Sequence, residues 1–359
     1  MINVCRSEVM NCALRAFGRA RFDPKKKISV VFIDSDGNGE GAVDDGGPLC
    51  EFLRLLMIDL RRSAIFQGPE NQKNLSLDVN ALQTGLYRLA GMMISVCLIH
   101  GGVAPNFFSD RLFNWISGKP TGPASLKDVG DQQVKDRLQK IKNAETIDEA
   151  REAIIEASEA LSVLGTMRYI SSMNERDHLV TNSIQQYVEG RVQTAFQEMF
   201  SSTDSLKGLN ALKLAEAIQA HPAQFKGLFL ENTQELNAAE LINLFHPVLS
   251  TVGSSRRREE SRVLCYWRDW LIDVEGGECS ELHLKDILIF ASGLSRIPPL
   301  GFPVQPTLEF LHTASNTTKP LPDAHTCSVV LRLPLHTSFA EFKFWMESGI
   351  IQSPTFGVS

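Results

Sequence analysis

The sequence predicts an α+β protein of two units. A large, mainly helical unit is expected over residues 1–249, and a smaller α/β unit over residues 250–359, with a flexible hinge between them. Three observations support this class. The chain has 359 residues, enough for more than one hydrophobic core. Helical patterns with capping signals dominate before a small, polar stretch, and an apolar strand-like run accompanies the helices after it.

Composition excludes several classes of protein. Hydrophobic residues make up 43% and charged residues 22%, as in ordinary globular domains. The net charge of -6 argues against a nucleic-acid partner. The most apolar run, at 89–99, is far short of the roughly 20 residues that span a bilayer, and the N-terminus has no signal-peptide order. We therefore expect a cytoplasmic or nuclear protein that binds neither nucleic acid nor membrane.

The first elements follow from local patterns. The β-branched run at 28–33 predicts a strand, and a Gly- and Asp-rich loop follows it. Pro48 suits the first turn of a helix that continues to residue 60. The apolar segment 82–99 predicts a second helix that is largely buried.

A separate helical insert is expected at about 120–176, where the composition first shifts to Gly, Pro, Ser and Lys. Thr146 and Glu149 form a capping box, and Ser183 and Gln186 form another. The helices predicted from here on cover 147–164, 184–199, 209–220 and 237–245, and prolines end the last two.

The segment 247–255 is small, polar and contains glycine, which favours a hinge. Helices are then expected at 263–271 and 284–291, followed by a proline-rich connection, a strand-like run at 327–333 and a helix at 338–349.

The loop at 34–45 resembles the start of an EF-hand calcium loop, with Asp45 at position 12. Position 12 should be a bidentate Glu, however, and Gly41 occupies a position that is normally aliphatic. A strand also precedes the loop where the EF-hand needs a helix. No two of the seven cysteines form a C-x-x-C pair either. We therefore expect no metal site.

Cys327 is the best candidate for chemistry. A cysteine nucleophile reacts as its thiolate and needs exposure, which a loop after a proline provides. His325 lies two residues earlier, about 6.6 Å away between Cα atoms in a straight strand, so a direct hydrogen bond would need a bend. The alternative is a buried structural thiol, because free cysteines often pack as small hydrophobic residues.

The context of Cys327 resembles a known family. Residues 321–327 (LPDAHTC), followed by LRLP at 331–334, are similar to the active-site signature of HECT-type ubiquitin ligases. The chain also resembles other family motifs in the expected order. They lie at 43–47 (VDDGG) with Glu51 and Phe52, at 180–188 and at 290–302. Phe356 matches the family's phenylalanine four residues from the end. Among subtypes, the chain looks most like the G2/M-phase-specific ubiquitin ligase-like group.

This resemblance implies a two-lobe HECT domain, with the N-lobe insert docking a ubiquitin-conjugating enzyme. Cys327 would take ubiquitin as a thioester and pass it to a lysine of a protein substrate. Thr326 would orient the loop, His325 would favour the thiolate or shape the loop, and Phe356 would position the lobe or the incoming lysine. The implied partners are ubiquitin, the conjugating enzyme and the substrate, and no cofactor is implied.

The sequence also departs from the family pattern. Ala324 replaces a common serine, Ser328 and Val329 replace the usual Phe-Asn, and the segment 120–176 lacks the usual apolar pattern. A non-catalytic HECT-like protein that only binds ubiquitin or a conjugating enzyme is therefore an alternative. A cysteine hydrolase is another, and it would need a histidine such as His336 beside the thiol.

Overall fold

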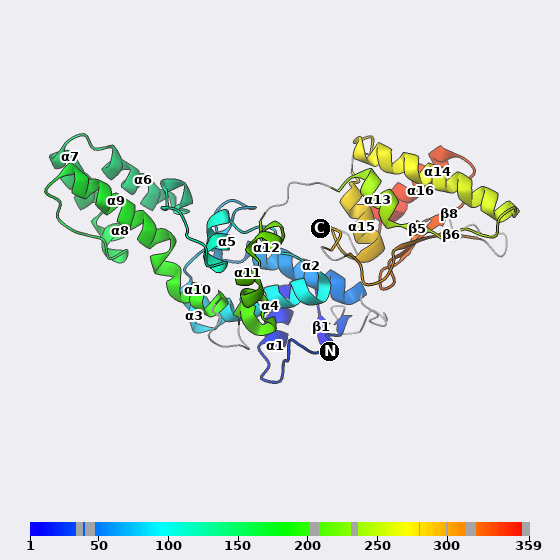
Figure 1. The fold of residues 1–359 in the computed structure, drawn as a ribbon, viewed down its shortest axis with the longest axis horizontal. Helices are drawn as coiled ribbons and strands as arrows, with labels where there is room; N and C mark the ends of the chain where they lie inside the picture. The colour runs from blue at the N-terminus through cyan, green and yellow to red at the C-terminus, as the bar shows by residue number, and fades with distance from the viewer. Residues whose placement is uncertain are drawn as a thin grey trace.

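The computed structural model describes residues 1–33, 39, 47–200, 208–230, 236–279, 281–298, 301–312 and 321–353. Figure 1 shows an elongated molecule, with α6–α9 at one end and the C-terminal elements at the other. The buried side chains form three hydrophobic clusters. We call them the N-terminal cluster (within residues 2–229), the insert cluster (within 124–188) and the C-terminal cluster (within 238–350).

The elements of the fold are as follows. The helices are α1 (Val9–Phe17), α2 (Gly47–Arg62), α3 (Val79–Gln83), α4 (Leu86–Gly101), α5 (Asp110–Ile116), α6 (Gln132–Asn143), α7 (Ile147–Glu156), α8 (Ser158–Val163), α9 (Met173–Val188), α10 (Gln193–Phe200), α11 (Leu214–Ala220), α12 (Pro222–Phe229), α13 (Ala238–Leu244), α14 (Ser255–Glu275), α15 (Leu284–Ser292) and α16 (Phe339–Ile351). The strands are β1 (Ile2–Val4), β2 (Val30–Phe32), β3 (Phe66–Gln67), β4 (Asn74–Leu75), β5 (His246–Pro247), β6 (Thr307–Leu311), β7 (Asp323–His325) and β8 (Val330–Pro334).

The helix α4 is the centre of the N-terminal cluster. All residues from Leu89 to Leu98 are buried, so the helix is covered on every side, as an apolar helix requires. The predicted helix at 48–60 is confirmed as α2. The predicted helix at 82–99 is confirmed as α4, but it begins only at Leu86, because Gly85 in the left-handed region separates it from the short α3. The predicted strand at 28–33 is β2, which pairs in parallel with β1.

The insert has its own core, which extends past the expected end at residue 176. The capping box at Thr146 is confirmed: its Oγ1 accepts from the Glu149 N–H at 3.2 Å. The second predicted box is wrong. Ser183 lies inside α9, buried, and its hydroxyl donates to Thr166 at 2.8 Å. The helix begins at Met173, eleven residues before the predicted start, and the side chain of Ser172 caps it.

The two cores do not divide at the predicted boundary of 249/250. The side chains of α13 pack in the C-terminal cluster, and β5 pairs with β6 of the C-terminal sheet. Among the described residues, the N-terminal cluster ends at Phe229 and the C-terminal one begins at Ala238. The division therefore falls between residues 230 and 236.

The predicted hinge at 247–255 is also corrected, because this segment is fastened to the C-terminal unit. The buried carboxylate of Glu260 accepts from the Ser250 N–H at 2.7 Å and from the Ser250 hydroxyl at 2.5 Å. The Arg257 guanidinium donates to the Ser250 carbonyl at 2.7 Å. Glu260 also contacts His312 Nε2 at 2.6 Å. The small, polar residues of this segment predict a flexible backbone. In the structure, however, Ser250 donates hydrogen bonds to the buried carboxylate of Glu260.

The C-terminal sheet has the strand order β5-β6-β8-β7, with β8 parallel to β6 and antiparallel to β7. Arg332 on β8 ties its neighbours together across the exposed face. Its guanidinium contacts Glu309 on β6 at 3.0 Å and Asp323 on β7 at 3.2 Å. This pairing fixes the hairpin between β7 and β8, which contains Cys327.

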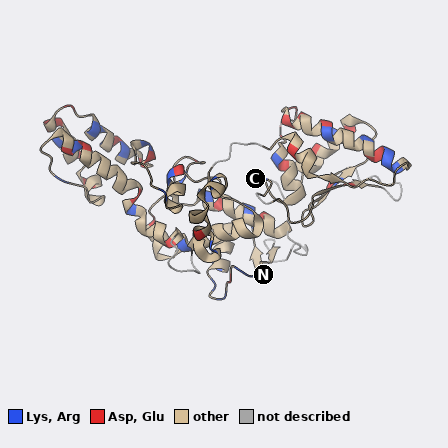
Figure 2. Ribbon diagram, in the orientation of Figure 1, with Lys and Arg blue, Asp and Glu red and all other residues tan. Residues whose placement is uncertain are grey.

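Charges of both signs alternate along the outer helices in Figure 2 and do not separate into broad regions of one sign. Within the described part of the chain, no helix has both the length and the apolar character needed to cross a membrane.

Candidate active site at the Cys327 turn

Cys327 lies in the tight turn between β7 and β8. The last pair of the antiparallel ladder is His325 with Val330, and the Ser328 N–H donates to the His325 carbonyl at 3.2 Å to close the turn. The thiol is free and half-buried. The turn therefore presents the sulfur at the end of the hairpin rather than inside the sheet, as a nucleophile requires.

Val329 gives this turn an unusual backbone. Its φ is 52°, in the left-handed region that Gly and Asn tolerate and that β-branched residues rarely adopt. The side chain is 4% exposed and packs in the C-terminal cluster. Burial of this side chain therefore holds a conformation that the backbone alone disfavours.

The neighbouring histidine does not contact the sulfur in this structure. His325 Nδ1 lies 3.0 Å from the Ser328 hydroxyl, within the same turn. This contact supports a role for His325 in shaping the loop. The other histidine considered, His336, stacks on Trp345 with 6.5 Å between ring centroids. Neither arrangement is the Cys-His pair of a hydrolase.

The sulfur of Cys327 instead contacts the N-terminal unit. The backbone N–H of Gly47, at the start of α2, donates to Sγ at 3.3 Å. A Cβ at position 47 would lie 3.2 Å from this sulfur and would collide with the Thr326 hydroxyl. The close approach of the turn to α2 therefore requires glycine at this position.

Two further contacts join the units around this point. The backbone of Gly293, which ends α15, faces Cys50 and Glu51 on α2, and Gly102 faces Pro298. Glu51 is 6% exposed and forms a two-pronged ion pair with Arg6, at 3.0 and 3.1 Å. This pair anchors the first turns of α2, to which the Cys327 turn docks.

The structure thus brings Thr326 and Cys327 together with Gly47. His325 lies in the same turn but contacts Ser328. Phe356 lies outside the described residues, as does nearly all of the loop at 34–45. Sequence reasoning did not predict the contact of Gly47 with Cys327, because these residues are 280 positions apart. The only sequence signal for this contact is the pair of consecutive glycines, 46 and 47, directly before Pro48.

Another thiol of the C-terminal unit contrasts with Cys327. Cys279 is 8% exposed and donates to a Glu347 carboxylate oxygen at 2.8 Å. Burial, reinforced by the hydrogen bond and charge of Glu347, raises the pKa of Cys279 to about 12. Cys279 is therefore a structural thiol.

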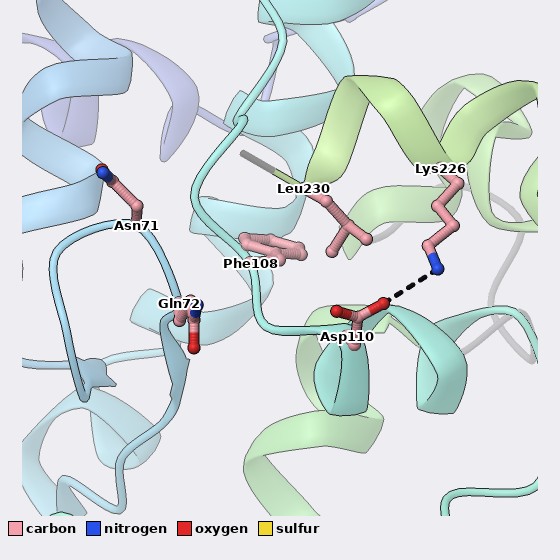
Figure 3. Close-up of a pocket in the computed structure, with 6 residues that line it drawn as sticks. All are labelled: Asn71, Gln72, Phe108, Asp110, Lys226 and Leu230. Carbon is pink, nitrogen blue, oxygen red and sulfur yellow. Dashed lines mark ion pairs between the residues drawn. The ribbon is translucent and has the colours of Figure 1, made fainter. Parts of the chain in front are cut away.

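A hollow of about 230 Å³ lies in the N-terminal unit, away from the Cys327 turn. Figure 3 shows Phe108 and Leu230 in its wall and the ion pair of Lys226 with Asp110 at 2.9 Å beside them. Across the described ranges, no group of three or more His, Cys, Asp or Glu side chains could hold a metal ion.

Comparison with known proteins places this chain in a family. The model of the HECT-domain (ubiquitin-transferase) family matches residues 57–359. The G2/M phase-specific E3 ubiquitin-protein ligase of Homo sapiens is 34% identical over 340 residues, 94% of this chain and 45% of that protein. The Gallus gallus protein of the same name is 32% identical over 348 residues, 96% of this chain and 44% of that protein.

The chain therefore spans less than half the length of these relatives. Its match to the family model covers most of its own length and includes the whole hairpin of Cys327. The chain belongs to the HECT family of E3 ubiquitin ligases.

Proposed function

We propose that this chain is an active ubiquitin-protein transferase, which accepts ubiquitin from a conjugating enzyme as a thioester on Cys327 and passes it to a substrate lysine. The observation that supports this most is the free thiol on a tight turn at the end of the β7–β8 hairpin. Covalent relay divides one difficult transfer into two easier ones. The half-buried sulfur is available to attack the incoming thioester once the turn leaves α2.

The insert is proposed to dock the conjugating enzyme, because apolar side chains lie exposed on it. Val163 is 84% exposed, Tyr169 73% and Ile155 67%. The Arg151 guanidinium lies 4.7 Å from the centre of the Tyr169 ring, one helical turn from Ile155 on α7. The segment 120–176 lacks the family's usual apolar pattern, yet the folded insert leaves these large apolar side chains exposed, where a partner could bury them.

The test is thioester trapping. The chain is mixed with activating enzyme, a panel of conjugating enzymes and ubiquitin, and the products are separated with and without reductant. We expect a thiol-sensitive adduct that Cys327→Ala removes. Cys265→Ala is the matched control, because Cys265 is an exposed thiol of the same unit. If no conjugating enzyme gives such an adduct, the chain is a binding protein and not a transferase.

A further inference from the structure

The docking of the Cys327 sulfur on α2 has two distinctive features. The first is the donor: Gly47 N–H is the first donor of the helix, and Pro48 after it has none. The second is the lack of space, because any side chain at position 47 would collide with the Thr326 hydroxyl. The contact is thus a backbone N–H aimed at sulfur, at a helix end where unpaired N–H groups favour negative charge.

This docked position differs from the one that loading needs. Figure 1 places α6–α9 at one end of the molecule and the C-terminal unit at the other. The elements of the N-terminal cluster lie between them. A conjugating enzyme on the insert must therefore meet Cys327 after the turn has left α2.

We propose that the Gly47 N–H is a catalytic group for the second step, onward transfer to lysine. This inference rests on the proposed function. The lysine amine attacks the thioester carbonyl carbon, a C–N bond forms, the C–S bond breaks, and the electron pair stays on Sγ while the amine releases its proton to solvent. The Gly47 N–H faces the atom on which negative charge develops, so it stabilises the departing thiolate of Cys327.

The experiment compares Gly47→Ala with Gly227→Ala, a helical glycine of α12 that faces open space. The protein is loaded with ubiquitin, the conjugating enzyme is inactivated, and discharge to free lysine is followed in a single turnover. We expect the ratio of discharge rate to loading rate to fall about tenfold in Gly47→Ala, less than the ~10²–10³ of an oxyanion-hole donor because sulfur is a weaker acceptor. Gly227→Ala should keep the parental ratio.

A second measurement needs no ubiquitin. Iodoacetamide labelling is measured well above the pKa of a free thiol, roughly 8.5, so that the rate reports on access to the sulfur and not on ionisation. There it should label Cys327 several-fold faster in Gly47→Ala, because the sulfur can no longer dock against α2. Adding Thr326→Ala removes the hydroxyl that the new methyl group strikes, so the double variant should recover part of the docking and part of the discharge rate. Melting of each variant beside the parent identifies any loss of folding.

The outcomes separate the two proposals. A parent chain that never forms the Cys327 adduct overturns the proposed function, and the role in transfer falls with it. A parent that loads, with Gly47→Ala discharging at the parental ratio, overturns the role of the Gly47 N–H alone. Unchanged iodoacetamide labelling in Gly47→Ala shows that the turn does not dock on α2 and overturns the inference at its first step.

Discussion

The C-terminal unit and the insert lie at opposite ends of the molecule and are built differently. The C-terminal cluster contains two fully buried tryptophans, Trp267 and Trp270, and beside it the buried carboxylate of Glu260 holds the chain at Ser250. The insert cluster consists mainly of small and aliphatic side chains from four helices. The proposed chemistry thus lies on a turn held by many contacts, whereas the proposed docking surface lies on a small body that leaves a few large apolar side chains exposed.

The largest difference should appear between two thiols of the C-terminal unit. Cys279, with its pKa raised to about 12 by burial and Glu347, should be ionised to about one part in 10⁴ at pH 8. Iodoacetamide labelling followed by mass spectrometry should therefore modify Cys327 and leave Cys279 intact. In Glu347→Gln, Cys279 should start to label at lower pH, because one cause of the raised pKa is gone. Labelling of Cys279 at pH 8 as fast as exposed Cys265 would contradict this view.

On the insert, the expected effect is on affinity. Ile155→Ser removes an apolar side chain that docking would bury, worth about 1.5 kcal/mol, so the KM for the conjugating enzyme in loading should rise about tenfold. The rate at saturating conjugating enzyme should change little. Ile272→Ser, at an isoleucine that is 57% exposed on α14, is the control. Equal effects of the two changes would show that the insert is not the docking surface.

A smaller effect tests the strain in the Cys327 turn. At position 329, Gly should be more stable than Ala by about 1 kcal/mol, because both lose the buried valine side chain but only Gly adopts a φ of 52° without cost. At exposed Glu259 in α14 the order should reverse, since Ala favours a helix. Chemical denaturation measures the free energy of unfolding of all four variants. If the Ala variant were more stable than the Gly variant at both positions, the turn would not be strained.

The smallest effect concerns acid stability. Burial alone would raise the pKa of Glu260, but hydrogen bonds from Ser250 and His312 outweigh it and lower the pKa below 4.5. A lowered pKa in the folded state contributes stability that is present above the unfolded pKa and is lost as the pH falls through the folded one. The melting temperature of the C-terminal unit should therefore fall in acid, and it should fall less in Glu260→Gln. Glu259→Gln should melt like the parent throughout.

Some of this architecture follows from local sequence. The caps at Thr146, Asn237 and Ser338 were predictable, because each is a signal spread over four residues. The sequence predicts that Pro222 ends a helix, yet this proline also begins α12 as its first residue. Local rules do not separate these two uses of proline.

Other features depend on distant contacts. The unit boundary was misplaced because β5 has only two residues and its strand identity comes from pairing with β6. Cys327 could be singled out from its motif, but its docking on Gly47 joins residues 280 positions apart. Such contacts arise from how the units pack, which no short pattern encodes.

The three separate hydrophobic clusters have a consequence for how the protein unfolds. Because each cluster closes within its own segment, heating can melt one without the others, and a single transition is not expected. Trp115 packs on the N-terminal cluster and Trp267 and Trp270 lie in the C-terminal one, while the sequence from 124 to 188 contains no tryptophan. Tryptophan fluorescence therefore reports on two of the three cores, and opening of the insert would be followed by circular dichroism instead.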